Sequence, residues 1–236
     1  MFDIHERERV PLVIFFDVDN TLLDNDSVTR DLRRHLELHV GEGRADRYFA
    51  LFEDLRRELG YADYLGALQR YRVERPQDAG VLEVSRFLLG YPFANRLYPG
   101  SLDAVEHCRS LGRVAILTDG DVVFQPRKIW RSGLWEAFGG EIVLALHKEL
   151  ELEEVARRQP AERYVLVDDK VRILAAVKEV WGDRVTTVFP RQGHYAVDAE
   201  LVARYPAPDL TIERIGDLVD LAPERLLEPA QVPRSS

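Results

Sequence analysis

Short, continuously apolar runs separated by longer amphipathic stretches are the feature that most restricts how this chain can fold. Each run is too short for a helix, and the lack of polar alternation is typical of strands covered on both faces. Such strands belong to parallel sheets, in which helices cover both sides. The runs are VPLVIFF at 10–16, VAILT at 114–118, EIVLA at 141–145, YVLVD at 164–168 and VTTVF at 185–189.

Amphipathic stretches lie between these runs. Residues 101–112 and 170–182 have helical patterning, and both end in a glycine suited to stopping a helix. The alternation of strand and helix predicts an α/β fold, a Rossmann-like, doubly wound parallel sheet. The ligand site of such a sheet lies beyond the carboxyl ends of its strands.

The stretch 24–95 departs from this alternation, because it has helical patterning and no convincing strand. Apolar residues recur at helical spacing before Gly41 and again before Gly60. We therefore predict that residues 24–95 form an inserted all-helical cap domain. Residues 1–23 and 96–236 would together form the α/β core domain.

Composition restricts the partners and the compartment. The chain has 236 residues, 46% of them hydrophobic and 31% charged, as in an ordinary globular protein. Its net charge of −9 argues against broad attraction to nucleic acid or an anionic membrane. No run approaches the roughly 20 apolar residues of a membrane span. The N-terminus lacks a signal-peptide pattern, and the lone Cys108 cannot form an internal disulfide. We expect a cytoplasmic monomer or homodimer that binds neither nucleic acid nor membrane.

Two carboxylates, Asp17 and Asp19, follow the first strand in the segment DVDNT. Side chains alternate along an extended chain, so residues two positions apart lie on the same side of it. One of the two carboxylates can then act as a nucleophile while the other donates and accepts protons. A solvated turn explains so short a pattern equally well. A calcium-binding loop is excluded, since Leu22 and Val28 stand where that loop requires glycine and glutamate.

Two other strand ends carry residues suited to a phosphate. Thr118, Asp119 and Gly120 offer a hydroxyl and backbone amides at a predicted helix start. A helix cap at Asp119 or Asp121 would explain the same residues. Lys148 follows the next strand and could bring a cation to this edge, although a solvated lysine is the simpler interpretation.

Adjacent carboxylates, Asp168 and Asp169, follow the YVLVD strand. Their hard oxygen atoms suit Mg²⁺, and two adjacent acids after an apolar strand do not serve packing alone. The sequence therefore predicts a magnesium site at the same sheet edge.

Taken in order, DVDNT, LTDG, Lys148 and VDDK resemble the four motifs of the haloacid dehalogenase-like superfamily of hydrolases. The resemblance covers about residues 12–189, and the helical stretch after the first motif looks like that superfamily's cap. It implies that Asp17 forms an aspartyl-phosphate, and that Asp19 protonates the leaving oxygen and then activates water. Thr118 and Lys148 would hold the transferring phosphoryl group.

The resemblance also implies which groups bind Mg²⁺. These are Asp17, the backbone carbonyl of Asp19 and the acidic pair, with Asp169 favoured over Asp168. Asp168 occupies the glycine position of the commoner fourth motif, which leaves the sharing of the metal between the two aspartates open. Lys128 is a rival for the lysine role, but we expect it to be a helix-surface or hinge residue.

The resemblance narrows the reaction as well. Dehalogenase members lack the second aspartate of the first motif and need no magnesium, so Asp19 argues against that branch. Phosphonate-cleaving relatives use a cap lysine, and this chain has none before Lys128. Signalling receiver domains carry similar groups in a different order. We expect a magnesium-dependent phosphatase acting on a small phosphorylated metabolite. The alternatives are a phosphomutase, or a weak family member that binds a phosphorylated metabolite or a protein partner without turnover.

Substrate choice is expected to lie in the cap. The segment GYADYLGALQRYR offers Tyr61, Tyr64 and Arg70 as candidate contacts. The two tyrosines also have core spacing, and most cap arginines are expected on solvated faces. We expect His194 to be a loop residue and not a catalyst.

Overall fold

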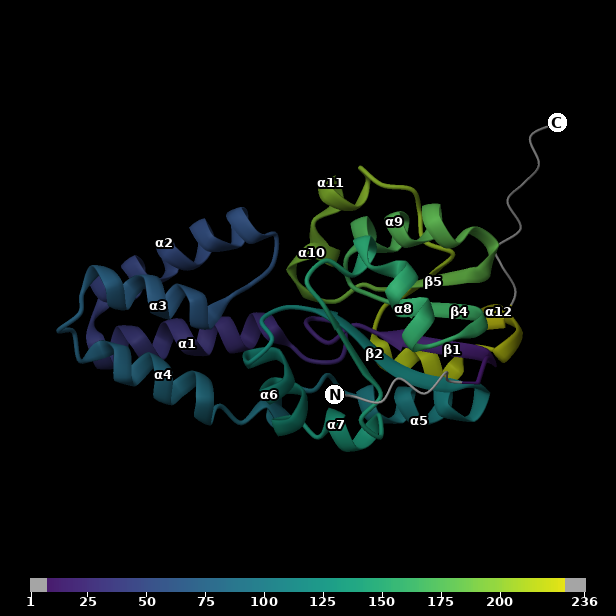
Figure 1. Ribbon diagram of the computed structural model, residues 1–236, viewed down its shortest axis with the longest axis horizontal. Helices are drawn as coiled ribbons and strands as arrows, with labels where there is room; N and C mark the ends of the chain where they lie inside the picture. Colours follow the sequence, from purple (N-terminus) through teal and green to yellow (C-terminus); the bar gives the residue numbers. More distant parts are fainter. Residues whose placement is uncertain (1–7, 228–236) are drawn as a thin grey trace.

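A computed structural model describes residues 8–227, and its six strands form one parallel sheet in the order β3-β2-β1-β4-β5-β6 (Figure 1). This confirms the predicted fold class. Residues 1–7, which entered the signal-peptide argument, lie outside the described part. The strand bounds are β1 Val10–Phe16, β2 Arg113–Asp119, β3 Ile142–Ala145, β4 Ala161–Val167, β5 Val185–Pro190 and β6 Leu210–Ile212.

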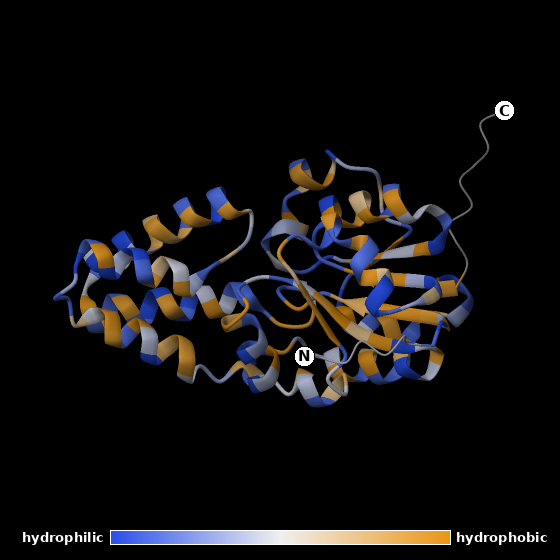
Figure 2. Cartoon of the chain, viewed as in Figure 1, coloured by the Kyte–Doolittle hydropathy of each residue, from blue (hydrophilic) through white to orange (hydrophobic). Residues whose placement is uncertain are grey.

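Helices cover both faces of the sheet, which explains why its strands are continuously apolar (Figure 2). Ile14 and Phe16 of β1 belong to the core that packs under α5 and α6. Val13 and Phe15 belong to the opposite core, under α8 and α9. The helices of the sheet layers are α5 Ser101–Leu111, α6 Phe124–Arg131, α7 Leu134–Ala137, α8 Leu152–Arg158, α9 Val171–Trp181, α10 Gly193–Val197, α11 Ala199–Val202 and α12 Pro223–Leu227. Short 3-10 turns are η2 Lys148–Leu150, η3 Gly182–Arg184 and η4 Ile215–Asp220.

The helices that directly follow β1 gather at one end of the molecule, away from the sheet (Figure 1). They are α1 Asn25–Val40, α2 Glu42–Leu59, α3 Tyr64–Glu74 and α4 Gly80–Gly90, followed by the 3-10 turn η1 Phe93–Arg96. We call residues 25–90 the helical lobe. Its helical character agrees with the sequence pattern, while the division into two domains stays a prediction.

The chain enters and leaves the helical lobe at adjacent points. Leu23 and Leu97 form an antiparallel bridge, and the Asp24 amide donates to the Arg96 carbonyl over 2.8 Å. Among residues 8–227, no helix combines the length and the apolar character that a membrane span requires.

Candidate functional site

The order of the strands places the site beyond the carboxyl end of β1, at the point where the strand order reverses. Strand β1 lies between β2 and β4, and the strands added after these extend the sheet in opposite directions. A doubly wound sheet binds its ligand at such a point. Asp17 follows β1 directly, Thr118 lies near the end of β2, and Asp168 follows β4. The three predicted motifs therefore meet at the carboxyl end of the sheet.

Lys148 connects two of these motifs through buried ion pairs. Its Nζ lies 2.6 Å from Asp17 Oδ1 and 2.6 Å from Asp168 Oδ2. Burial opposes its charge, but the carboxylates of Asp168, Asp17 and Asp119 prevail and raise the pKa of Lys148 well above its usual value. Lys148 is therefore a buried cation at the predicted nucleophile and not a solvated lysine.

An acidic cluster lies beside this lysine. Asp17, Asp168 and Asp169 are all buried, and each offers a carboxylate oxygen within 4.8 Å of the others. Asp17 Oδ2 and both carboxylate oxygens of Asp169 have no hydrogen-bond partner. Burial raises the pKa of Asp168 to about 6 and that of Asp169 well above its usual value. Buried carboxylates without partners are costly, and three hard oxygen ligands are a donor set that fits Mg²⁺.

Thr21 of the DVDNT segment holds this acidic cluster in place. The backbone amide of Asp169 donates to Thr21 Oγ1 over 3.0 Å, and Gln192 Nε2 donates to the Thr21 carbonyl over 3.1 Å. The last residue of the first motif thus fixes the loop that carries the fourth.

Asp19 has a partner that the sequence did not indicate. Lys128 Nζ lies 2.6 Å from Asp19 Oδ1 and donates to Asn25 Oδ1 over 3.0 Å. The expectation of a helix-surface or hinge lysine was wrong, since the Lys128 side chain is only 1% exposed. Lys128 lies one helical turn after the buried Phe124, so both occupy the inward face of α6.

Of the predicted phosphate-binding residues, Thr118 lies near the carboxyl end of β2, and Asp119 contacts the backbone of Lys148. The Thr118 hydroxyl is buried and accepts a hydrogen bond from Gln125 Nε2 over 3.0 Å. Asp119 Oδ1 accepts from the Lys148 backbone amide over 2.9 Å. Asp119 therefore orients the turn that carries Lys148.

Gly120 lies in the loop between β2 and α6, with a φ of 144°. The helix begins at Phe124 and not directly after the glycine. Asp121 Oδ1 accepts from the Val123 amide over 2.9 Å, so Asp121 and not Asp119 orders this turn. The phosphate-binding role of Gly120 stays a prediction.

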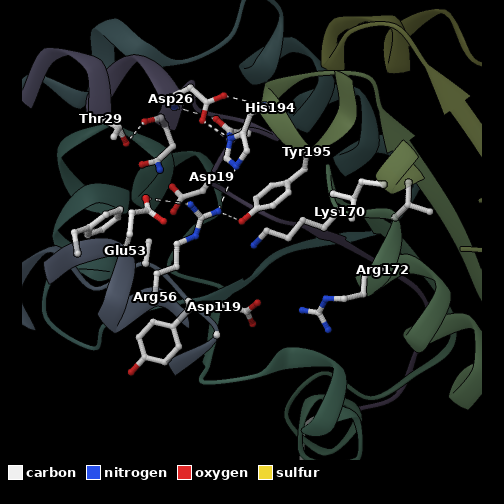
Figure 3. Close-up of a pocket in the computed structure, with 18 of the residues that line it drawn as sticks. Asp19, Asp26, Thr29, Glu53, Arg56, Asp119, Lys170, Arg172, His194 and Tyr195 are labelled. Atoms are coloured by element: carbon white, nitrogen blue, oxygen red, sulfur yellow. Dashed lines mark hydrogen bonds and ion pairs between the residues drawn. The ribbon is translucent and has the colours of Figure 1, made fainter. Parts of the chain in front are cut away.

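A cavity of about 540 Å³ lies between the sheet edge and the helical lobe (Figure 3). Two of the candidate substrate contacts, Tyr61 and Tyr64, line this cavity, and their contact with a substrate stays a prediction. Tyr64 is buried, and its hydroxyl lies 2.6 Å from Thr29 Oγ1. Arg70 is not among the lining residues, because its guanidinium extends to Glu58 over 2.7 Å.

His194 also lines the cavity, at the start of α10 and not in a loop. Its Nδ1 lies 2.7 Å from Asp26 Oδ1, and its backbone amide donates to Asp26 Oδ2 over 2.9 Å. Burial alone would raise the pKa of Asp26, but the His194 contacts lower it. Arg56 of α2 lies 3.3 Å from His194 Nε2. His194 of α10 therefore contacts the helical lobe through both Asp26 and Arg56.

Comparison with known proteins identifies the family. A haloacid dehalogenase-like hydrolase model matches residues 12–180, while no curated protein matches the chain. A haloacid dehalogenase-like hydrolase from Burkholderia xenovorans is 56% identical, with a TM-score of 0.88 over 92% of this chain and 99% of that chain.

Two more distant structures show a similarity of fold alone. L-2-haloacid dehalogenase from Xanthobacter autotrophicus, with chloropropionic acid covalently bound, is 20% identical (TM-score 0.58, covering 90% of this chain and 98% of that chain). The hydrolase YfnB from Bacillus subtilis, bound to magnesium, is 16% identical (TM-score 0.62, covering 91% and 100%). The family model spans most of the chain and its motifs meet at one sheet edge, so this protein belongs to the haloacid dehalogenase-like hydrolases.

Proposed function

We propose that this hydrolase is a magnesium-dependent phosphatase that cleaves a small phosphate monoester through an aspartyl-phosphate on Asp17. The observation that carries the proposal is the second carboxylate, Asp19, beside the buried cluster of Asp17, Asp168 and Asp169. Dehalogenases of the superfamily lack that second aspartate and need no metal. The two features together favour phosphoryl transfer over carbon–halogen cleavage.

In the first step, a carboxylate oxygen of Asp17 attacks phosphorus as the bond to the leaving oxygen breaks. The Lys148 ammonium fixes Asp17 Oδ1, which leaves Oδ2 without a protein partner and able to react. Asp19, two residues further along, gives its proton to the leaving alkoxide. The alcohol product departs and the phosphoryl group stays on Asp17.

In the second step, Asp19 takes a proton from water, and the water oxygen attacks phosphorus. The bond between phosphorus and Asp17 breaks, so inorganic phosphate leaves and the Asp17 carboxylate is restored. The Thr118 hydroxyl and Lys148 would hold the phosphoryl oxygens through both steps. Asp17, Asp168, Asp169 and the Asp19 carbonyl would hold Mg²⁺, which supplies positive charge against the phosphoryl oxygens when bound.

The helical lobe would act as the cap, within the predicted boundaries 24–95. It supplies Tyr61, Tyr64 and Arg56 to the cavity wall, while the sheet edge supplies the proposed catalytic groups. A partly enclosed cavity of this kind would limit water and hold a small leaving group near Asp19.

Phosphate release from a panel of monoesters, with Mg²⁺ and with chelator, tests the proposal. We expect metal-dependent turnover that falls by at least about 10³-fold in Asp17→Asn, because the amide is nearly isosteric but a poor nucleophile. Circular dichroism and the thermal midpoint of the variant control for folding.

A parallel assay of chloride release from 2-chloropropionate addresses the dehalogenase alternative. Chloride release without phosphate release would overturn the phosphatase. Release of neither product would instead favour the weak family member that binds without turnover.

A further inference from the structure

Two cations flank one aromatic ring in the wall of the cavity. The Arg56 guanidinium carbon lies 5.4 Å from the ring centre of Tyr195, and Lys170 Nζ lies 5.6 Å from it. Arg56 comes from α2 of the helical lobe, whereas Lys170 precedes α9 and Tyr195 lies in α10. Figure 3 shows both charged ends directed toward the open space, with Tyr195 between them.

Neither cation has a strong acidic partner. Arg56 Nη1 lies 3.6 Å from Glu53 Oε1, but the Glu53 side chain is 55% exposed, and such surface pairs contribute little. The other contacts of Arg56 are the Tyr195 hydroxyl and His194 Nε2. No acidic group in the described part of the chain forms an ion pair with Lys170.

Both side chains are cations at neutral pH, since the ordinary pKa of lysine is about 10.4 and that of arginine is above 12. Two positive charges beside one partly buried ring repel each other. That repulsion is offset if an anion lies between them.

The acids around the cavity are already engaged elsewhere. Asp26 pairs with His194, and Asp19 pairs with Lys128. Asp119 accepts the backbone amide of Lys148. None of these three carboxylates forms an ion pair with Arg56 or Lys170, so both cations can meet an anionic group that enters the cavity.

We propose that Arg56, Lys170 and Tyr195 form a subsite for a second anionic group on the leaving part of the substrate. The substrate class is then a phosphate monoester that also carries a carboxylate or a second phosphate. This inference rests on the proposed function for the phosphate at Asp17. An arginine can bind either oxyanion through two parallel hydrogen bonds, and the exposed Glu53 contact is easily released.

Matched ligand pairs test the subsite. 3-Phosphoglycerate differs from glycerol 3-phosphate by a carboxylate in place of a hydroxymethyl group. Fructose 1,6-bisphosphate differs from fructose 6-phosphate by a second phosphate. The first pair detects a carboxylate subsite and the second a phosphate subsite. Hydrolysis is measured for native protein, Arg56→Gln and the control Arg57→Gln, whose side chain is 77% exposed on the same helix.

We expect native protein to prefer the ligand with the extra anion in at least one pair. Arg56→Gln should lower kcat/KM for that ligand by about 10- to 100-fold, mainly through KM, and for its partner by less than about 3-fold. Arg57→Gln should change neither. Equal losses for both ligands of each pair would mean that Arg56 only holds the lobe against α10, and would overturn the subsite.

Calorimetry with Mg²⁺ in an Asp17→Asn background separates this inference from the proposed function. The subsite predicts tighter binding of the more anionic ligand, lost when Arg56→Gln is added. If native protein releases no phosphate but this binding preference depends on Arg56, the phosphatase proposal fails and the subsite stands. If no ligand binds, or the preference survives Arg56→Gln, the subsite is overturned.

Discussion

At the scale of single residues, the environment of Asp19 follows from a helix that begins more than a hundred positions later. Lys128 is buried and contacts both Asp19 and Asn25. Asn25 is the first residue of α1, and its amide donates to the Tyr64 hydroxyl over 3.3 Å. The proposed acid–base group is thus connected through Lys128 and Asn25 to the first helix of the lobe.

Replacing Lys128 should impair chemistry more than substrate binding. Lys128→Met removes the cation beside Asp19, so we expect kcat to fall by about 10-fold or more while KM changes less than about 3-fold. Lys128→Arg should recover part of the loss, because a charge is restored. Steady-state kinetics on one monoester measure both. An unchanged kcat in Lys128→Met would show that the ion pair has no part in positioning Asp19.

Cys108 should be inert in the native protein. Burial raises the pKa of its thiol to about 12, so at pH 8 only about one molecule in ten thousand carries the thiolate. We expect no reaction with a disulfide reagent until denaturant is added, and then one equivalent. Rapid labelling under native conditions would mean that the helix carrying Cys108 opens readily.

The residues that the sequence predicted and those it missed differ in what positions them. Asp17 and Asp168 directly follow apolar strands, so parallel pairing alone brings them together. Lys128 and Arg56 point inward because of how their helices are rotated, and that rotation is decided by packing. His194 does not directly follow a strand, and nothing in its local sequence distinguishes it from a loop residue.

At the scale of elements, strand length limited the prediction. The five longer apolar runs all became strands, whereas β6 was missed. It has only three residues, and its middle residue, Thr211, is exposed. A pattern that short carries no period, so pairing with β5 is what makes it a strand.

The end of α2 depends on a glycine. Gly60 has a φ of 81°, and a Cβ added there would lie 3.0 Å from His147 Cε1. We expect Gly60→Ala to lower the free energy of unfolding by about 1 kcal/mol or more. Urea denaturation measures the change.

Gly43, near the start of the same helix, is the matched control. A Cβ at Gly43 meets nothing within 4 Å, so Gly43→Ala should leave stability unchanged or raise it by up to about 1 kcal/mol. Equal effects of the two substitutions would contradict a specific role for the turn at Gly60.

At the scale of the whole molecule, the acidic cluster should link metal binding to stability. Mg²⁺ that binds the folded chain should raise the thermal midpoint by roughly 5 °C when present well above its dissociation constant. Asp169→Asn should abolish most of that shift. It should not lower the midpoint of the metal-free protein, because one costly buried charge is gone.

Differential scanning calorimetry, with KCl at equal ionic strength as control, separates specific binding from screening. A shift of the same size in Asp169→Asn would place the cation elsewhere.

The adjacent crossing points of the helical lobe also bear on how the chain folds. Strand β1 must pair with β2, and the whole lobe separates them in sequence. Long closures are entropically costly and slow folding. Once the lobe folds, the bridge between Leu23 and Leu97 brings the ends of that loop together. For the unfolded remainder, β1 and β2 then behave as if joined by a short connection, so early formation of the lobe should speed assembly of the sheet.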